Sequence, residues 1–103
     1  GDALDFNLYN FPNPFGQSTR IVFQHNQPNV AMEVDLKIFG TNGQLIFNKS
    51  QQMQPTGSFT YWTWEGTDRS GAKVANGVYM CQLNIKTSTG ISKTVYHKIV
   101  FSR

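Results

Sequence analysis

Alternation of apolar and polar side chains with a period of two residues constrains this chain more than any other feature. In the stretch EVDLKIF, the apolar residues Val34, Leu36 and Ile38 alternate with three charged residues. Such alternation places successive side chains on opposite faces of an extended strand, one face buried and the other in water. The same period recurs in VYMCQLNIK, residues 78–86. The pattern therefore predicts strands, and no segment has a convincing helical period.

Turn-forming residues separate these segments at intervals of roughly 10 to 15 residues. Asn42-Gly43 is typical of a hairpin turn, because both residues tolerate positive φ. Further turns are predicted around Pro55 and Gly57, Asp68 and Gly71, Asn76 and Gly77, and residues 87–90. The strands expected between the turns are residues 6–9, 18–25, 33–39, 44–48, 58–64, 78–86 and 91–101. This arrangement predicts an all-β fold, an Ig-like antiparallel β-sandwich of about seven strands.

The length of 103 residues suits one domain. We expect residues 1–5 to be a linker and residues 6–103 to form a single Ig-like β-sandwich. The net charge is +3, and the Lys and Arg residues are scattered, so we expect no nucleic-acid partner. No apolar run approaches the ~20 residues of a membrane-spanning helix.

Cysteine and histidine are too scarce for most metal or disulfide chemistry. The single Cys81 excludes an internal disulfide, and one cysteine with two histidines is a poor ligand set for zinc. We expect no metal site, no cofactor and no small-molecule substrate. Cys81 is also in phase with the apolar residues Tyr79, Leu83 and Ile85, which predicts a buried and unreactive thiol.

The other residues with possible chemistry also have simpler interpretations. His25 lies at a predicted strand end, where a capping or turn role is expected, and His97 is expected to be exposed or on an edge strand. Glu65 and Asp68 flank Gly66 in a turn, where acidic side chains commonly accept hydrogen bonds from backbone amides. We therefore expect no catalytic residue in this chain.

The stretch YNFPNPFGQSTRIVFQHNQP, residues 9–28, specifies both ends of one strand. Pro12 and Pro14 fix their own φ angles and favour extended geometry in the preceding residues. Asn13 is expected to bond its own backbone two residues on, and Phe15 to close the end of the sandwich as an apolar plug. Pro28 prevents the strand from continuing past His25.

Aromatic residues alternate in SFTYWTW, residues 58–64. Trp62 and Trp64 share one face, predicted to be core, and Phe59 and Tyr61 share the other. If that second face is open, it forms an aromatic patch of a kind that often marks a partner contact.

The final strand, residues 91–101, runs almost to the last residue and has apolar side chains on both faces. It is either inserted beside other strands or offered to a partner by edge pairing. Lys93 and Lys98 alternatively protect that edge from aggregation.

Several of these motifs resemble a known family. YNFPNPFGQSTRIVF, IFGTNGQLI and WEGTDRSGAKVANGVYMCQL are similar to the C-terminal domains of the type IX secretion system of Bacteroidota and to flagellar hook-capping Ig-like domains. FQHNQP, residues 23–28, resembles the C-terminal domain of the gingipain-like type IX sortases. The resemblance covers residues 7–103, with one departure at Glu65, where Asp is commoner. The positions that carry these motifs are His25, Asn26, Pro28, Gly43, Trp64, Gly66, Asp68, Gly71, Gly77 and Tyr79.

The resemblance implies a non-enzymatic recognition and sorting domain. It would mediate type IX secretion and outer-membrane docking of a surface protein by protein–protein contact, with a cysteine-peptidase sortase as the parent. Its partners would be type IX outer-membrane components or the rest of the parent, and it would be a monomer or a strand-swapped dimer. The residues expected to contact a partner are Asn13, Pro14, Phe15, Lys98, Ile99, Val100 and Phe101. The alternatives are a structural or glycan-binding Ig-like module and a flagellar hook-capping domain.

Overall fold

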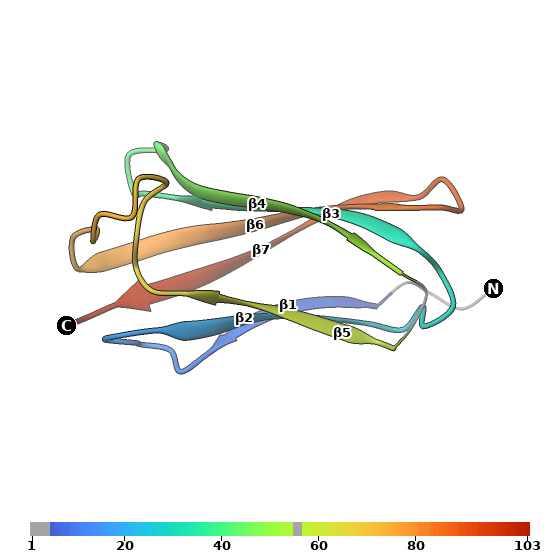
Figure 1. Cartoon of the computed structure of the whole chain (residues 1–103), viewed down its shortest axis with the longest axis horizontal. Coiled ribbons are helices and arrows are strands. Elements are labelled where there is room, and N and C mark those ends of the chain that lie inside the picture. The colour runs from blue at the N-terminus through green and yellow to red at the C-terminus, as the bar shows by residue number, and fades with distance from the viewer. Residues whose placement is uncertain (1–4, 55–56) are drawn as a thin grey trace.

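Two antiparallel sheets pack face to face in the computed structural model, which describes residues 5–54 and 57–103 (Figure 1). The strands are β1 (Phe6–Phe11), β2 (Thr19–His25), β3 (Met32–Phe39), β4 (Leu45–Met53), β5 (Phe59–Trp64), β6 (Gly77–Thr87) and β7 (Ser92–Phe101). One sheet has the order β1-β2-β5 and the other the order β4-β3-β6-β7. The predicted all-β, Ig-like sandwich of seven strands is confirmed. The described residues contain no helix long and apolar enough to cross a membrane.

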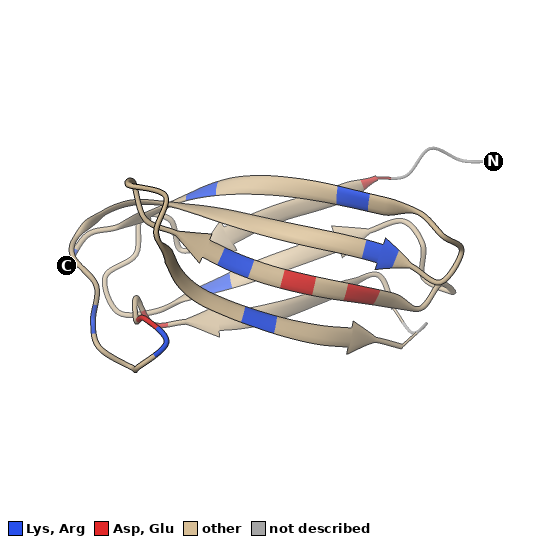
Figure 2. Ribbon diagram, turned by 90° about the horizontal axis from the view of Figure 1, so that it is seen from above, with Lys and Arg blue, Asp and Glu red and all other residues tan. Residues whose placement is uncertain are grey.

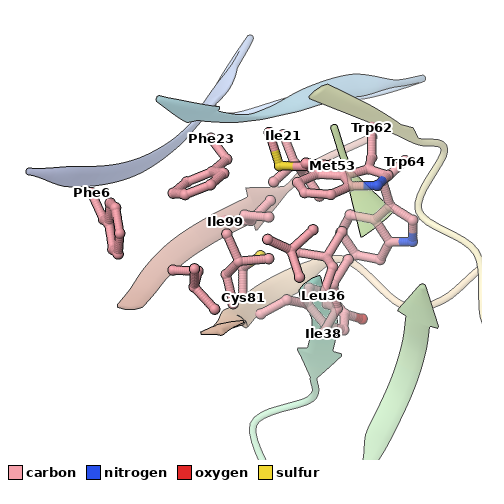
Figure 3. Packing of buried hydrophobic residues seen from close by; sticks show 14 of the residues in the cluster. Phe6, Ile21, Phe23, Leu36, Ile38, Met53, Trp62, Trp64, Cys81 and Ile99 are labelled. Atoms are coloured by element: carbon pink, nitrogen blue, oxygen red, sulfur yellow. The ribbon is translucent and has the colours of Figure 1, made fainter. Parts of the chain in front are cut away.

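The core lies between the sheets and is filled by the apolar residues that alternate along each strand. Figure 3 shows Ile21 and Phe23 of β2 facing Leu36 of β3 and Ile99 of β7 across the interior. Cys81 of β6 is fully buried in the same layer, which confirms its predicted phase. The remaining core side chains are Phe6, Phe15, Met32, Val34, Ile38, Met53, Trp62, Trp64, Tyr79, Leu83, Ile85 and Phe101.

Strand β4 is longer than the sequence pattern predicts. It was expected over residues 44–48 but continues to Met53, paired with β3 along its whole length. Residues 48–52 are polar and exposed, so this part of β4 lacks the alternation that identifies a strand. Hydrogen bonds to β3 support it instead, including a 2.9 Å bond from the Ser50 hydroxyl to Asp35 Oδ1.

The described turns largely follow their predicted chemistry. Gly43 has φ of +80°. The β3–β4 hairpin is closed by main-chain bonds from the Gly40 amide to the Gln44 carbonyl and from the Gly43 amide to the Gly40 carbonyl. At Asn76 the chain makes a bend that leads into β6, rather than the tight turn that was predicted. The turn expected at Pro55, and residues 1–4 of the expected linker, lie outside the described residues.

Charged residues are spread along the strands with both signs interspersed, as the ribbon in Figure 2 shows in a view turned by 90° from that of Figure 1. No continuous block of one sign is visible in that view. This distribution agrees with the interpretation of the Lys and Arg residues as a solvated surface.

Candidate interaction corner

Residues 12–16, called the corner below, connect β1 to β2 and reach across to the final strand of the opposite sheet. The Phe11-Pro12 and Asn13-Pro14 peptide bonds are both cis. The Asn13 side chain donates from Nδ2 to the Lys98 carbonyl at 3.2 Å and accepts from the Val100 amide at Oδ1, at 2.9 Å. Asn13 therefore does not make the local turn expected from the sequence. The side-chain amide of Asn13 instead bonds β7 in the way that a peptide group of a neighbouring strand would.

Phe15 continues the same pairing through its main chain. Its amide donates to the Val100 carbonyl at 3.0 Å, and its carbonyl accepts from the Ser102 amide at 2.8 Å. These bonds form a parallel bridge between Phe15 and Phe101. The corner thus acts as a short additional strand that closes the outer edge of β7 near its C-terminal end.

Aromatic packing fixes the corner from inside. The Phe15 ring is buried, with its centroid 5.4 Å from that of Trp64 and 4.8 Å from that of Phe101. Gly66, at φ +69°, lies against the tip of the Phe101 ring, and a Cβ at this position would sit 2.8 Å from Phe101 Cζ. Phe15 therefore closes the end of the sandwich, as predicted.

A buried polar network lies beneath the corner. Asn10 Nδ2 donates to the Thr19 hydroxyl at 3.0 Å and to the Pro12 carbonyl at 3.1 Å, and the Thr19 hydroxyl donates to the same carbonyl at 2.8 Å. The side-chain oxygen of Asn10, Oδ1, lies 2.6 Å from Nε2 of His97 in β7. The network connects β1, β2 and β7 and satisfies the polar side-chain atoms that the corner buries.

His97 meets one of its two predicted alternatives, the edge strand, but it is not exposed. Its ring is half-buried and points between the sheets toward Asn10. Burial lowers the pKa of His97, since the charged form loses hydration. The Asn10 oxygen can only accept a hydrogen bond, so the neutral His97 ring carries its proton on Nε2 and donates it to Asn10.

The structure brings together the residues predicted to contact a partner. The Asn13 side chain and Phe15 main chain bond directly to residues 98–102. The side chains of Phe15, Ile99 and Phe101 are buried in the core, whereas Asn13, Pro14 and Lys98 are exposed and Val100 is half-buried. Their contact with a partner stays a prediction, and only the exposed members offer a surface for it.

Strand β7 is consequently divided along its outer edge. Within its sheet it is hydrogen-bonded to β6, and β1 of the other sheet also packs against it, through the Asn10–His97 contact and Lys93 over the Phe6 ring. The corner bonds only its C-terminal part. Because edge-facing groups alternate along a strand, the main-chain groups of Thr94 and Tyr96 face the same edge as those of Val100. Among the described residues, no corner bond reaches that N-terminal half.

The FQHNQP motif builds a turn at the far end of β2. His25 is buried, and its Nδ1 accepts from the Gln27 amide at 3.0 Å, which confirms the predicted turn role. Asn26 accepts from the Asp5 amide at 3.0 Å, and Pro28 follows, exposed, after the strand has ended. Burial lowers the pKa of His25, so its neutral form is favoured as the acceptor of this bond.

The WEGTDRSG motif also has a structural explanation. Asp68 Oδ1 accepts from the Ser70 hydroxyl and from the amides of Ser70 and Ala72. The bond from the Ser70 hydroxyl is the main cause of the lowered pKa of the Asp68 carboxyl, and the Ala72 amide lowers it further. Trp64 Nε1 donates to the Thr67 carbonyl at 2.9 Å, and the Tyr79 hydroxyl donates to the Ala75 carbonyl. Asp68 thus holds a turn, as predicted.

The residues considered for chemistry do not assemble into a reactive site. Burial raises the pKa of the Cys81 thiol to about 12, which disfavours a thiolate. Cys81 is paired in register with His97, whose ring bonds Asn10 instead. In the described ranges, no three His, Cys, Asp or Glu side chains gather in a way that would hold a metal ion.

Two features escaped the sequence interpretation. The Asn10–His97 contact joins residues 87 positions apart, and neither strand alternation nor turn chemistry predicts it. Tyr9 and Phe11 were not assigned to the face that Phe59 and Tyr61 occupy, although all four are exposed there. Extending the predicted first strand from residue 9 to Phe11 would have placed both aromatic residues on that face.

The chain was compared with known proteins by sequence and by structure. The model of the FlgD Ig-like domain family matches residues 10–90. No match to a curated protein was found. Dimeric latent PorU from Porphyromonas gingivalis is similar over 97% of this chain and 9% of its own, with a TM-score of 0.80 and 22% identity.

Two other solved structures have the same fold. FlgD from Xanthomonas campestris, a protein of flagellar hook capping, matches with a TM-score of 0.63 and 18% identity, over 93% of this chain and 66% of its own. A β-glucuronidase from Parabacteroides merdae matches with a TM-score of 0.65 and 12% identity, over 97% of this chain and 14% of its own. The chain therefore spans about a tenth of the PorU chain and just under two thirds of FlgD. At these identities the likeness shows the fold alone.

The predicted likeness to hook-capping Ig-like domains is confirmed by the family match, and the fold is shared with a region of PorU. The family is a non-catalytic type of module, in keeping with the buried thiol and the structural role of Asp68. Since the family model covers most of its length, the chain belongs to the FlgD Ig-like domain family.

Proposed function

We propose that this chain is a recognition and sorting domain of a Bacteroidota surface protein, acting in type IX secretion and outer-membrane docking. The parent would be a PorU-like cysteine-peptidase sortase whose catalytic domain lies outside this chain. The domain would then reside at the outer membrane or cell surface and bind type IX outer-membrane components or its own parent.

The observation that carries this proposal is the likeness to PorU, with a TM-score of 0.80 over 97% of the chain. The value for FlgD is 0.63 over 93%. The FQHNQP turn, which resembles that of the sortase domains, supports the same choice. Its conformation depends on His25, whose Nδ1 accepts the Gln27 amide.

The division of β7 suggests how a partner would be bound. The corner fixes residues 98–102, while Thr94 and Tyr96 present main-chain groups at an edge that the corner does not cover. A partner strand could add there, with backbone hydrogen bonds supplying affinity. The exposed Pro14 and Lys98 lie near the end of that edge, where they could contact the same partner.

The test compares two substitutions at one edge position in the parent protein. Tyr96→Pro removes an edge-facing amide, whereas Tyr96→Ala keeps that amide. Both variants lose the Tyr96 hydroxyl, which accepts from Gln82 of β6 at 3.2 Å, so the edge-facing amide is what distinguishes them. We expect the proline variant to lose surface delivery or docking and the alanine variant to keep both. Thermal unfolding of each domain would establish that both variants are folded.

Two failures have different meanings. If Tyr96→Pro reaches the surface and works at the normal level, docking through the β7 edge is wrong. If a parent lacking residues 6–103 altogether is delivered and docked normally, the sorting role is wrong. Deletion of residues 94–103 alone is a poorer test, because it removes Ile99 and Phe101 from the core.

A second candidate is a role in flagellar hook capping, which the family match itself favours. Complementation of a strain without a hook cap would support it. If this chain does not complement that strain, and Tyr96→Pro in the parent protein abolishes secretion, the sorting role is supported over hook capping.

A further inference from the structure

The outer face of the three-stranded sheet exposes four aromatic side chains, which is unusual for so small a domain. The exposed fractions are 38% for Tyr9, 74% for Phe11, 60% for Phe59 and 47% for Tyr61. Trp62 and Trp64 take no part, because their rings are buried on the opposite face. Contiguous exposed apolar side chains commonly mark a binding surface.

Strand register places these side chains on a grid of three rows. The first row is Asn7, Gln24 and Phe59, the second is Tyr9, Val22 and Tyr61, and the third is Phe11, Arg20 and Thr63. The apolar positions form a stripe that crosses the sheet diagonally from Phe11, through the whole middle row, to Phe59. We call it the aromatic stripe.

Groups able to hydrogen-bond flank the aromatic stripe on both sides. Asn7 and Gln24 lie on one side, and Arg20 and Thr63 on the other. All four are exposed. The Arg20 guanidinium is stacked 4.9 Å from the centre of the Tyr61 ring, which holds its donors beside the stripe.

The size of the aromatic stripe argues against a protein partner as its main occupant. The grid measures about 10 Å by 14 Å between its outer Cα atoms. As a flat footprint this is roughly 140 Å², a small patch beside the ~800 Å² of accessible surface that each partner contributes to a stable protein interface, so a protein partner would need contacts beyond this sheet face.

A linear oligosaccharide matches both the stripe and its borders. Pyranose rings have an apolar C–H face, which stacks on aromatic rings, and a rim of hydroxyls, which bond amides and guanidinium groups. The stripe runs about 17 Å from Phe11 to Phe59, enough for a short run of linked rings. None of the nine grid positions is acidic and one is basic, so the sugar would be neutral or acidic.

We propose that the aromatic stripe is a glycan-binding platform for a neutral or acidic oligosaccharide. This site is independent of the corner and of β7, which lies in the other sheet. It would attach the domain to polysaccharide at a cell surface, whatever protein partner the β7 edge has. Binding by the isolated chain therefore does not depend on the sorting role.

Titration calorimetry of the chain with cellohexaose, chitohexaose and a hexamer of galacturonic acid tests the proposal. We expect saturable binding of at least one hexamer and at least tenfold weaker binding by Tyr61→Ala and by Phe59→Ala. Both side chains are exposed, so neither change should unfold the domain. Tyr96→Ala is the matched control, since Tyr96 is 61% exposed on the other sheet, and it should bind like the unaltered chain.

Three results would overturn the proposal. They are no saturable binding of any hexamer, equal binding by the unaltered chain and Tyr61→Ala, and equal loss of binding in Tyr96→Ala. Sedimentation provides a further discrimination. A dimer that Tyr61→Ala dissociates, in a chain that binds no hexamer, would assign the aromatic stripe to a second copy of the chain.

Discussion

The two halves of β7 share one strand and one neighbour but differ in what meets their outer edge. Residues 98–102 are hydrogen-bonded to Asn13 and Phe15, and the buried Phe101 ring packs against Phe15 and Gly66. Residues 92–97 have no such bonds from the corner in the described structure. The difference teaches that the last strand is not uniformly available for docking. Its C-terminal half is part of the fold, and its N-terminal half is the part that a partner could extend.

The largest effect is expected from Gly66→Ala, which acts on the fixed half. A Cβ at this position would meet the Phe101 ring at 2.8 Å, and the φ of +69° disfavours any L side chain. Strain and overpacking together should lower the free energy of unfolding by about 3 kcal/mol. Thermal denaturation measures this as a fall of roughly 15 °C in Tm.

Gly71→Ala is the control, because its φ is +90° but nothing lies within 4 Å of the added Cβ. This variant should lower the free energy of unfolding only by the cost of placing an L residue at positive φ, about 1–2 kcal/mol. If both variants lose the same free energy of unfolding, the close contact between Gly66 and Phe101 does not stabilise β7.

Proline substitutions compare the two halves directly. Val100→Pro removes the amide that donates to Asn13 Oδ1, whereas Tyr96→Pro removes an amide that the corner does not bond. We expect about 2 kcal/mol of destabilisation for Val100→Pro from the lost bond and the disturbed corner. Tyr96→Pro should cost clearly less in denaturant unfolding. A reversed order would contradict the division of β7.

Asn13→Ala sharpens the comparison by removing the side chain that bonds β7. Two hydrogen bonds, to Lys98 and Val100, are lost at an exposed site where water can replace them. We expect a loss of about 1 kcal/mol in chemical denaturation. Asn42→Ala, whose side chain bonds only the local Gln44 amide among the contacts described, is the control and should leave the exchange of the Val100 amide unchanged.

The smallest effect is expected from pH. Burial lowers the folded-state pKa of both His25 and His97, so the unfolded chain binds protons more readily. Their contribution to stability is therefore complete above the unfolded pKa of about 6.5 and is lost as pH falls from there toward the folded pKa. Unfolding midpoints measured from pH 7.5 down to 5 should decrease, and less steeply in His97→Gln. An increase in stability on acidification would show that the histidines are not neutral in the fold.

The sequence predicted those parts of the fold that depend on local alternation. The burial of Cys81, Trp62 and Trp64 follows from strand phase alone. The second half of β4 was missed because its polar residues have no apolar period, and its pairing with β3 stabilises it instead.

The site was less accessible to prediction, because its contacts join distant segments. The sequence pointed to Asn13 and to the final strand separately, but not to the bonds between them, which span 85 and 87 residues. A local turn was the natural expectation for an Asn between two prolines. Only the packing of both sheets brings the corner beside β7, and the same packing brings Asn10 of β1 against His97.

Amide hydrogen exchange along β7 tests the central claim most directly. The edge-facing amides of Val100 and Ser102 are bonded to the corner, and those of Thr94 and Tyr96 are not. We predict slow exchange at Val100 and Ser102 and fast exchange at Thr94 and Tyr96, with Asn13→Ala selectively accelerating Val100. Uniform protection of all four amides, or fast exchange at Val100 in the unaltered chain, would contradict the division of the strand into a fixed half and an available half.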